Sequence, residues 1–142
     1  MATPQELRQH GKFYEFLHVS WGIIEFRADE GILKAYCLSS QDVRAKPLLD
    51  LNFGRKLSLF RNMGVISIED YNIVCQFKTK RNNLFHTGGL YVSSLTNEEK
   101  EQIMDIGQKA IDIMENLSNL LSERQKGRYV YLQKEKRDNY DK

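Results

Sequence analysis

The stretch TNEEKEQIMDIGQKAIDIMENLSNLL, residues 96–121, carries the clearest structural signal in the chain. Thr96, followed three residues later by Glu99, forms a capping box that predicts the start of a helix. Apolar residues then recur every three or four positions, which is the spacing of one helix face: Ile103, Ile106, Ala110, Ile113, Leu117 and Leu120. Because the opposite face is charged, the pattern predicts a long helix packed on a core or on a dimer seam.

The N-terminal part of the chain shows a second helical pattern. It begins near Pro4, since proline is tolerated in a first helical turn. Apolar residues keep helical spacing from Phe13 to Ile24, and the pattern continues to Tyr36. Three glycines interrupt it: Gly11, Gly22 and Gly31. Each costs ~1 kcal/mol relative to alanine, so we expect a weakened but continuous helix, with a kink or break only near Gly31.

Two shorter helices are predicted between these long ones. Pro47 suits the first turn of a helix whose apolar residues form one continuous stripe: Leu49, Phe53, Leu57 and Phe60. Gly64 stands at the left-handed position that ends such a helix.

The next helix is predicted to start at Ser67, whose hydroxyl can cap the backbone near Asp70, and to run to about Phe85 before Gly88 and Gly89. Its expected core residues are Ile68, Tyr71, Val74, Cys75 and Phe77. Four helices with short links predict an all-α, up-and-down bundle of four to five helices.

Composition limits the class of protein. The 142 residues suit one domain, 1–142, with a basic C-terminal extension from about residue 125. No apolar run approaches the ~20 residues that span a bilayer, and the start of the chain lacks a signal peptide. Cys37 and Cys75 have no metal-type spacing, so we expect buried thiols in a reducing cytoplasm, with no metal and no cofactor.

Charge is unevenly distributed along the chain. Residues 122–142 contain seven Lys and Arg against four Asp and Glu, whereas residues 97–123 contain seven acidic and two basic residues. The segment 44–61 has five basic residues and one acidic residue. Such asymmetry is compatible with an anionic partner such as RNA, and equally with a solvated surface.

The segment Arg81-Asn82-Asn83-Leu84-Phe85-His86 combines a phosphate-binding and a proton-transferring side chain. Arginine is a permanent cation whose rigid fork fits a phosphate, and histidine exchanges a proton near neutral pH. If a second copy of the helix packs alongside, this pair suits cleavage of RNA through its 2′-hydroxyl without a metal. The structural alternative is a helix end whose cations complement the helix dipole.

The surroundings of this motif resemble the HEPN superfamily. The stretch FGRKLSLFRNMGVIS, residues 53–67, is followed by a helix that ends in Arg81-Asn82 and His86. This is similar to HEPN members with an apolar helix, a Gly-Ile-Ser type link and a closing Arg-Asn-x-x-x-His. The resemblance covers about residues 48–120, roughly half the chain.

The resemblance implies a dimerising bundle in which two motif helices build one composite site. Arg81 and His86 match the catalytic pair of active members, and Asn82 matches a residue that helps to position the site. The residues expected to guide RNA to this site are basic: Lys78, Lys80, Arg55, Lys56 and Arg61. The implied partners are RNA, a second copy of the chain and a cognate antitoxin or defence protein, with no membrane.

Two functional hypotheses follow. The first is a metal-independent endoribonuclease acting as a toxin or antiviral defence effector. The second is a non-catalytic HEPN-like module that regulates or binds a partner, with the basic tail around Tyr129 and Tyr140 as a docking arm. In toxins silenced by a partner nucleotidyltransferase, a tyrosine follows the histidine by two residues. That position is Gly88 here, which argues against the same control.

Overall fold

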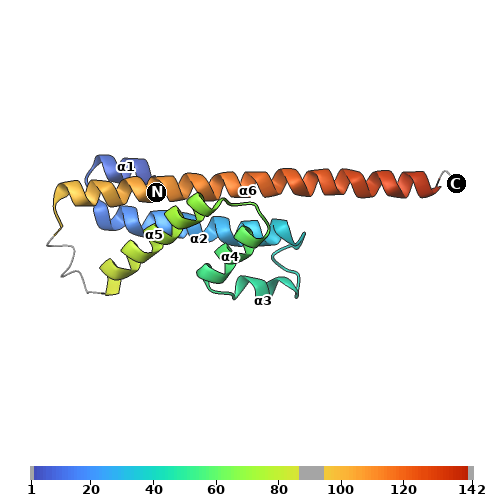
Figure 1. The fold of residues 1–142 in the computed structure, drawn as a ribbon, viewed down its shortest axis with the longest axis horizontal. Helices are drawn as coiled ribbons and strands as arrows, with labels where there is room; N and C mark the ends of the chain where they lie inside the picture. The colour runs from blue at the N-terminus through green and yellow to red at the C-terminus, as the bar shows by residue number, and fades with distance from the viewer. Residues whose placement is uncertain (1, 87–94, 141–142) are drawn as a thin grey trace.

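The computed structural model describes residues 2–86 and 95–140, with side chains for 2–85 and 95–125. All regular structure in these ranges is helical, which confirms the predicted all-α class. The helices, shown in Figure 1, are α1 (Pro4–Gln9), α2 (Phe13–Ala35), α3 (Ala45–Leu49), α4 (Phe53–Asn62), α5 (Ile68–His86) and α6 (Asn97–Tyr140).

The N-terminal pattern forms two helices, so the prediction of a helix continuing through Gly11 is wrong. Gly11 has a φ of 67°, in the left-handed region, and the chain turns there before α2 begins. Glycine enters this region without the steric penalty of a Cβ. By contrast, α2 continues through Gly31 without a break.

The predicted helix from Pro47 to Phe60 is also two helices. Its apolar stripe is interrupted after α3, and α4 makes a new start at Asn52, whose side chain accepts a hydrogen bond from the Arg55 backbone at 2.9 Å. The side-chain oxygen of an asparagine at this position satisfies a backbone amide that the helix itself leaves unpaired. The hydrophobic spacing continues across this cap and therefore predicted one helix instead of two.

Three local signals are confirmed. Gly64 ends α4 with a φ of 72°. The Ser67 hydroxyl accepts a hydrogen bond from the Asp70 backbone at 3.1 Å. Thr96 and Glu99 exchange two capping hydrogen bonds, each 3.1 Å long, at the start of α6.

The order of helix directions differs from a simple up-and-down bundle. Phe13 near the start of α2 lies beneath Lys100 near the start of α6, and Lys34 near the end of α2 contacts Ser118 farther along α6. The two longest helices therefore run in the same direction, as Figure 1 shows.

The link between α2 and α4 explains the departure. Phe53, at the start of α4, packs on Trp21 with ring centroids 4.7 Å apart, and Lys56, farther along α4, reaches Asp29, farther along α2. The segment between α2 and α4, which contains α3, therefore brings the chain back, and α4 then runs forward beside α2. By contrast, α5 runs against α2 and α6, since Phe77 meets Gly107 and Leu84 lies near Ile103.

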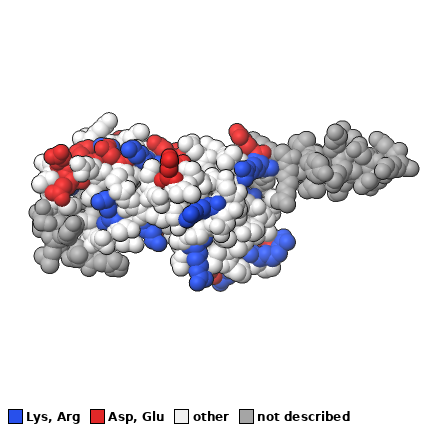
Figure 2. Space-filling model, in the orientation of Figure 1, with Lys and Arg blue, Asp and Glu red and all other residues white. Residues whose placement is uncertain are grey.

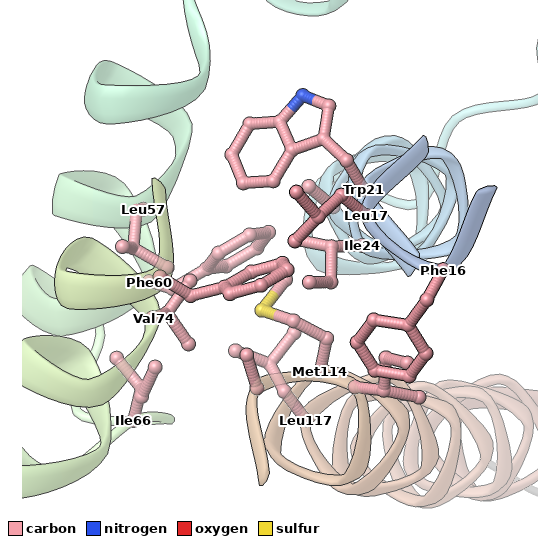
Figure 3. Packing of buried hydrophobic residues seen from close by; sticks show 14 of the residues in the cluster. Phe16, Leu17, Trp21, Ile24, Leu57, Phe60, Ile66, Val74, Met114 and Leu117 are labelled. Atoms are coloured by element: carbon pink, nitrogen blue, oxygen red, sulfur yellow. The ribbon is translucent and has the colours of Figure 1, made fainter. Parts of the chain in front are cut away.

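One hydrophobic cluster joins α2, α4, α5 and α6. Figure 3 shows aromatic and aliphatic side chains from these helices meeting at its centre. Its closest backbone approach is at Gly107 of α6, where a Cβ would come within 2.8 Å of Phe77 and 2.9 Å of Phe16. A residue without a side chain is therefore needed for α6 to sit this near its neighbours.

The buried face of α6 is rotated from the predicted stripe. Ile103, Ala110 and Leu117 are buried as expected, but Leu120 is exposed. The remainder of the face comes from positions outside the stripe: Met104, Gly107, Ile111, Met114, Ser118 and Leu121. In α5 the predicted core residue Ile68 is likewise exposed, and Leu84 is buried instead.

The last helix extends beyond the rest of the fold. It has 44 residues, or roughly 66 Å at 1.5 Å per residue. Figure 1 shows its C-terminal part continuing past α2, in the segment predicted as a basic extension. None of the described helices combines the length and apolar character needed to cross a membrane.

Candidate functional site

The Arg81-to-His86 motif lies in the last turns of α5, as predicted. Arg81 and Asn82 are both partly buried. His86 is the last residue of the helix, and its side chain lies outside the described residues, as do Gly88 and Gly89.

Arg81 is held between aromatic rings. Its guanidinium carbon lies 5.2 Å from the ring centre of Trp21 in α2 and 4.7 Å from that of Phe85 one turn along α5. Both distances are within the range of cation–π attraction. Trp21 is fixed in turn by Phe53 and Phe77, so the base of this site is part of the hydrophobic core.

The charge of Arg81 is not compensated by an ion pair among the described residues. Its Nη1 donates a long hydrogen bond of 3.4 Å to Asn82 Oδ1, and its buried Nε has no partner in the described part of the chain. Burial lowers the pKa of Arg81, an effect that the more distant Glu25 carboxylate partly opposes. The site is therefore a partly desolvated cation with donor capacity left for an anion.

Arg81 and His86 occupy different sides of α5. Five residues correspond to a rotation of about 140° around the axis of an α-helix. Arg81 contacts α2, so position 86 lies well around the helix from that contact. A single chain does not bring the two positions to one point, and a joint site requires a second copy of α5.

Lys56 has a different environment from the one expected of an RNA-binding residue. Only 8% of the residue is exposed, and its ammonium pairs with Asp29 at 2.5 Å. Lys56 therefore joins α4 to α2, and its contact with RNA stays a prediction.

The other predicted RNA-binding residues are distributed over two sides of α5. The Lys78 ammonium lies over Gly54, where it would be 3.3 Å from an added Cβ, and Arg55 is exposed beside it in sequence. Lys80 instead lines a pocket of about 260 Å³ between α5 and α6, together with Glu99. Lys78 and Arg55 thus border the Arg81 side of the fold, whereas Lys80 does not.

Arg61 is exposed at the end of α4, 5.1 Å from the ring centre of Tyr71. The charge distribution is visible in Figure 2, where acidic side chains gather along the edge formed by α1 and the first half of α6. Basic side chains lie over the face formed by α4 and α5. An anionic polymer is expected to approach that second face.

The residues that the structure describes contain no cluster suited to hold a metal ion. Neither Cys37 nor Cys75 forms a disulfide, and the prediction that both are buried is wrong, since Cys37 is exposed and Cys75 only partly buried. Cys37 follows the end of α2 with a φ of 54°, in the left-handed region, where the helix pattern that predicted burial has stopped.

Sequence reasoning missed Trp21 and Tyr14 as neighbours of the motif. Trp21 contacts Arg81, and the ring of Tyr14 lies 6.2 Å from that of Phe85. Both belong to the N-terminal helical pattern, about 60 to 70 residues earlier in the chain. The one available signal was that Trp21 is the only tryptophan. No family model, curated protein or solved structure matches this chain.

Proposed function

We propose that this protein is a metal-independent endoribonuclease of the HEPN type, with one composite site formed by the α5 helices of two copies. The observation that carries the proposal is the partly buried guanidinium of Arg81, which has no ion-pair partner among the described side chains and lies less than two turns before His86. A cation held without a carboxylate partner is suited to a phosphate, because the phosphate supplies the missing charge and hydrogen-bond acceptors.

The proposed reaction is attack of an RNA 2′-hydroxyl on the adjacent phosphorus. One His86 takes the hydroxyl proton, and His86 of the partner subunit protonates the 5′-oxygen as its bond to phosphorus breaks. Arg81 stabilises the charge that develops on the phosphorane oxygens, and Asn82 holds the guanidinium. The products are a 2′,3′-cyclic phosphate and a 5′-hydroxyl, and the reaction consumes no cofactor.

The experiment is cleavage of a mixed RNA pool by purified protein in EDTA. Wild type is compared with His86→Ala, Arg81→Met and the matched control Arg27→Met, which removes another partly buried arginine that lies over an aromatic ring. Cleavage with cyclic phosphate ends by wild type and Arg27→Met alone supports the proposal. Intact RNA with every folded, dimeric variant would overturn it.

A second candidate is a non-catalytic module that binds RNA or a protein partner, such as an antitoxin or defence protein. The observation that favours it is the placement of Arg81 against α2, on a different side of α5 from position 86. This candidate predicts RNA or protein binding without cleavage, and a homodimer in which the two α5 ends do not meet. Cross-linking through cysteine introduced at Asn83, an exposed position on α5, distinguishes the two dimers.

A further inference from the structure

Phe85, which borders Arg81, and its neighbour Tyr14 are exposed aromatic side chains. Phe85 is 42% exposed and Tyr14 is 40% exposed, and their ring centres are 6.2 Å apart in an edge-to-face arrangement. They come from α5 and α2, so the tertiary fold brings them together. Large apolar side chains left open beside an uncompensated cation form a mixed surface, with one part for π-stacking and one for an anion.

We infer that Tyr14 and Phe85 form a stacking platform for an unpaired RNA base, while Arg81 binds the phosphate next to that base. The inference rests on the proposed function for its choice of RNA as the ligand. Phe85 links the two parts, since its ring is 4.7 Å from the Arg81 guanidinium and in contact distance of Tyr14. A base on this platform therefore has its backbone beside the cation.

The platform selects single-stranded RNA. Bases in a duplex are stacked on one another and present only their edges, whereas unpaired bases can stack on aromatic side chains. The RNA strand is expected to continue from Arg81 toward two basic residues. Lys78 lies over Gly54, at the start of α4, and Arg55 is exposed there. Glu25 is the acidic residue whose charge reaches Arg81, and it lies on α2.

The test measures binding separately from cleavage. The full-length His86→Ala protein is titrated with three probes: a 2′-O-methylated single-stranded 10-mer, its duplex, and inorganic polyphosphate. Trp21 is the only tryptophan and contacts both Arg81 and the core, so its fluorescence reports occupancy of this site. Each probe is also titrated against Tyr14→Leu, Phe85→Leu and the control Phe26→Leu, whose aromatic ring is 61% exposed elsewhere on α2.

The expected result is that the single strand binds and changes Trp21 fluorescence, with weaker binding of the duplex. Tyr14→Leu and Phe85→Leu each weaken the single strand by roughly tenfold, as expected for one lost stacking contact. Polyphosphate has no bases, so its affinity is unchanged by either substitution, and Phe26→Leu changes none of the three.

The inference would be overturned if Tyr14→Leu and Phe85→Leu weakened the binding of polyphosphate as much as that of single-stranded RNA. Equal effects of Phe26→Leu and Phe85→Leu on RNA affinity, or tighter binding of the duplex, would also overturn it. Absence of RNA binding would overturn it together with the proposed function. Platform-dependent binding without cleavage by the wild type would uphold the inference and reject only the nuclease activity. Cleavage that is insensitive to Tyr14→Leu and Phe85→Leu would uphold the nuclease activity and reject the stacking platform.

Discussion

Lys34 and Arg81 are two partly buried cations with opposite surroundings. The Lys34 ammonium donates to Glu30 Oε1 at 2.8 Å and to Ser118 Oγ at 2.9 Å, and the Ser118 hydroxyl donates to the same carboxylate. Arg81 has aromatic rings around it, an unpartnered Nε and no carboxylate partner among the described residues. The first site is complete within the chain, and the second lacks an anion.

This difference separates a structural charge from a candidate functional one. Burying a cation is costly, and a complete set of partners offsets the cost. At Lys34 the partners join α2 to α6, so the charge contributes to the fold. At Arg81 the cost is left partly uncompensated, which is expected where a ligand completes the site.

The largest expected effect on stability concerns the close packing of α6 at Gly107. Gly107→Val should lower the free energy of unfolding by about 3 kcal/mol, because overpacking a tight core forces side chains and backbone apart. An added Cβ already meets Phe77 at 2.8 Å and Phe16 at 2.9 Å. Urea denaturation measures the change.

The matched control is Gly22→Ala in α2, where nothing lies within 4 Å of an added Cβ. Alanine is the better helix former, so this variant should gain about 0.5–1 kcal/mol. A Gly107→Val protein as stable as wild type would show that α6 does not pack this closely.

The second largest effect is the loss of stability when the paired cation, Lys34, is removed. Lys34→Met should lower the free energy of unfolding by about 2 kcal/mol, since it removes one member of a hydrogen-bonded charge network. The cost is moderate because the Lys34 and Glu30 side chains are 23% and 26% exposed. Thermal or urea unfolding gives the value.

The double variant Lys34→Met with Glu30→Met provides the check on pairing. Removing both charges should cost less than the sum of the single substitutions, because no unpaired carboxylate is left. Strict additivity would mean that the two groups do not interact.

The third effect is a pH dependence of the stability that Glu30, the partner of Lys34, contributes. Hydrogen bonds from Lys34 and then Ser118 lower the pKa of Glu30 below its ordinary value of 4.5. A carboxyl with a lowered folded pKa contributes stability that is present above pH 4.5 and is lost as the pH falls through the lowered value. The stability advantage of wild type over Glu30→Gln should therefore shrink between pH 6 and pH 3, and a constant gap would contradict the pairing.

The smallest expected change in stability is at the unpaired cation. Arg81→Met keeps an apolar stem on Trp21 and removes a desolvated charge, so the free energy of unfolding should change by less than about 1 kcal/mol. RNA binding should nevertheless fall, as measured by Trp21 fluorescence. The same replacement by methionine at Lys34 and Arg81 thus has opposite consequences, and a larger stability loss at Arg81 would reverse the comparison.

Much of the local structure was predictable because it depends on near neighbours in the chain. Ser67 with Asp70 and Thr96 with Glu99 are three residues apart, and Gly64 acts through its own backbone. The two breaks that were missed, at Gly11 and Asn52, are equally local. They were overlooked because hydrophobic spacing continued across them.

The face of α6 could not be read from apolar residues alone. Gly107 gives no hydrophobic signal, yet its lack of a side chain sets the closest approach to Phe16 and Phe77. Leu120 fitted the predicted stripe but lies on the exposed side. The stripe was assigned by spacing, whereas the buried face is set by which helices α6 contacts.

The sequence by itself determined the helical class, most helix ends and the position of the Arg81-to-His86 motif at the end of α5, because capping and helical periodicity act within a few residues. Only the tertiary structure decided that Lys56 and Lys34 are paired, that Arg81 has no ion pair within the described residues, and that Tyr14 and Trp21 stand beside the motif. Pairing and desolvation depend on groups distant in the chain, and the packing of whole helices brings those groups together.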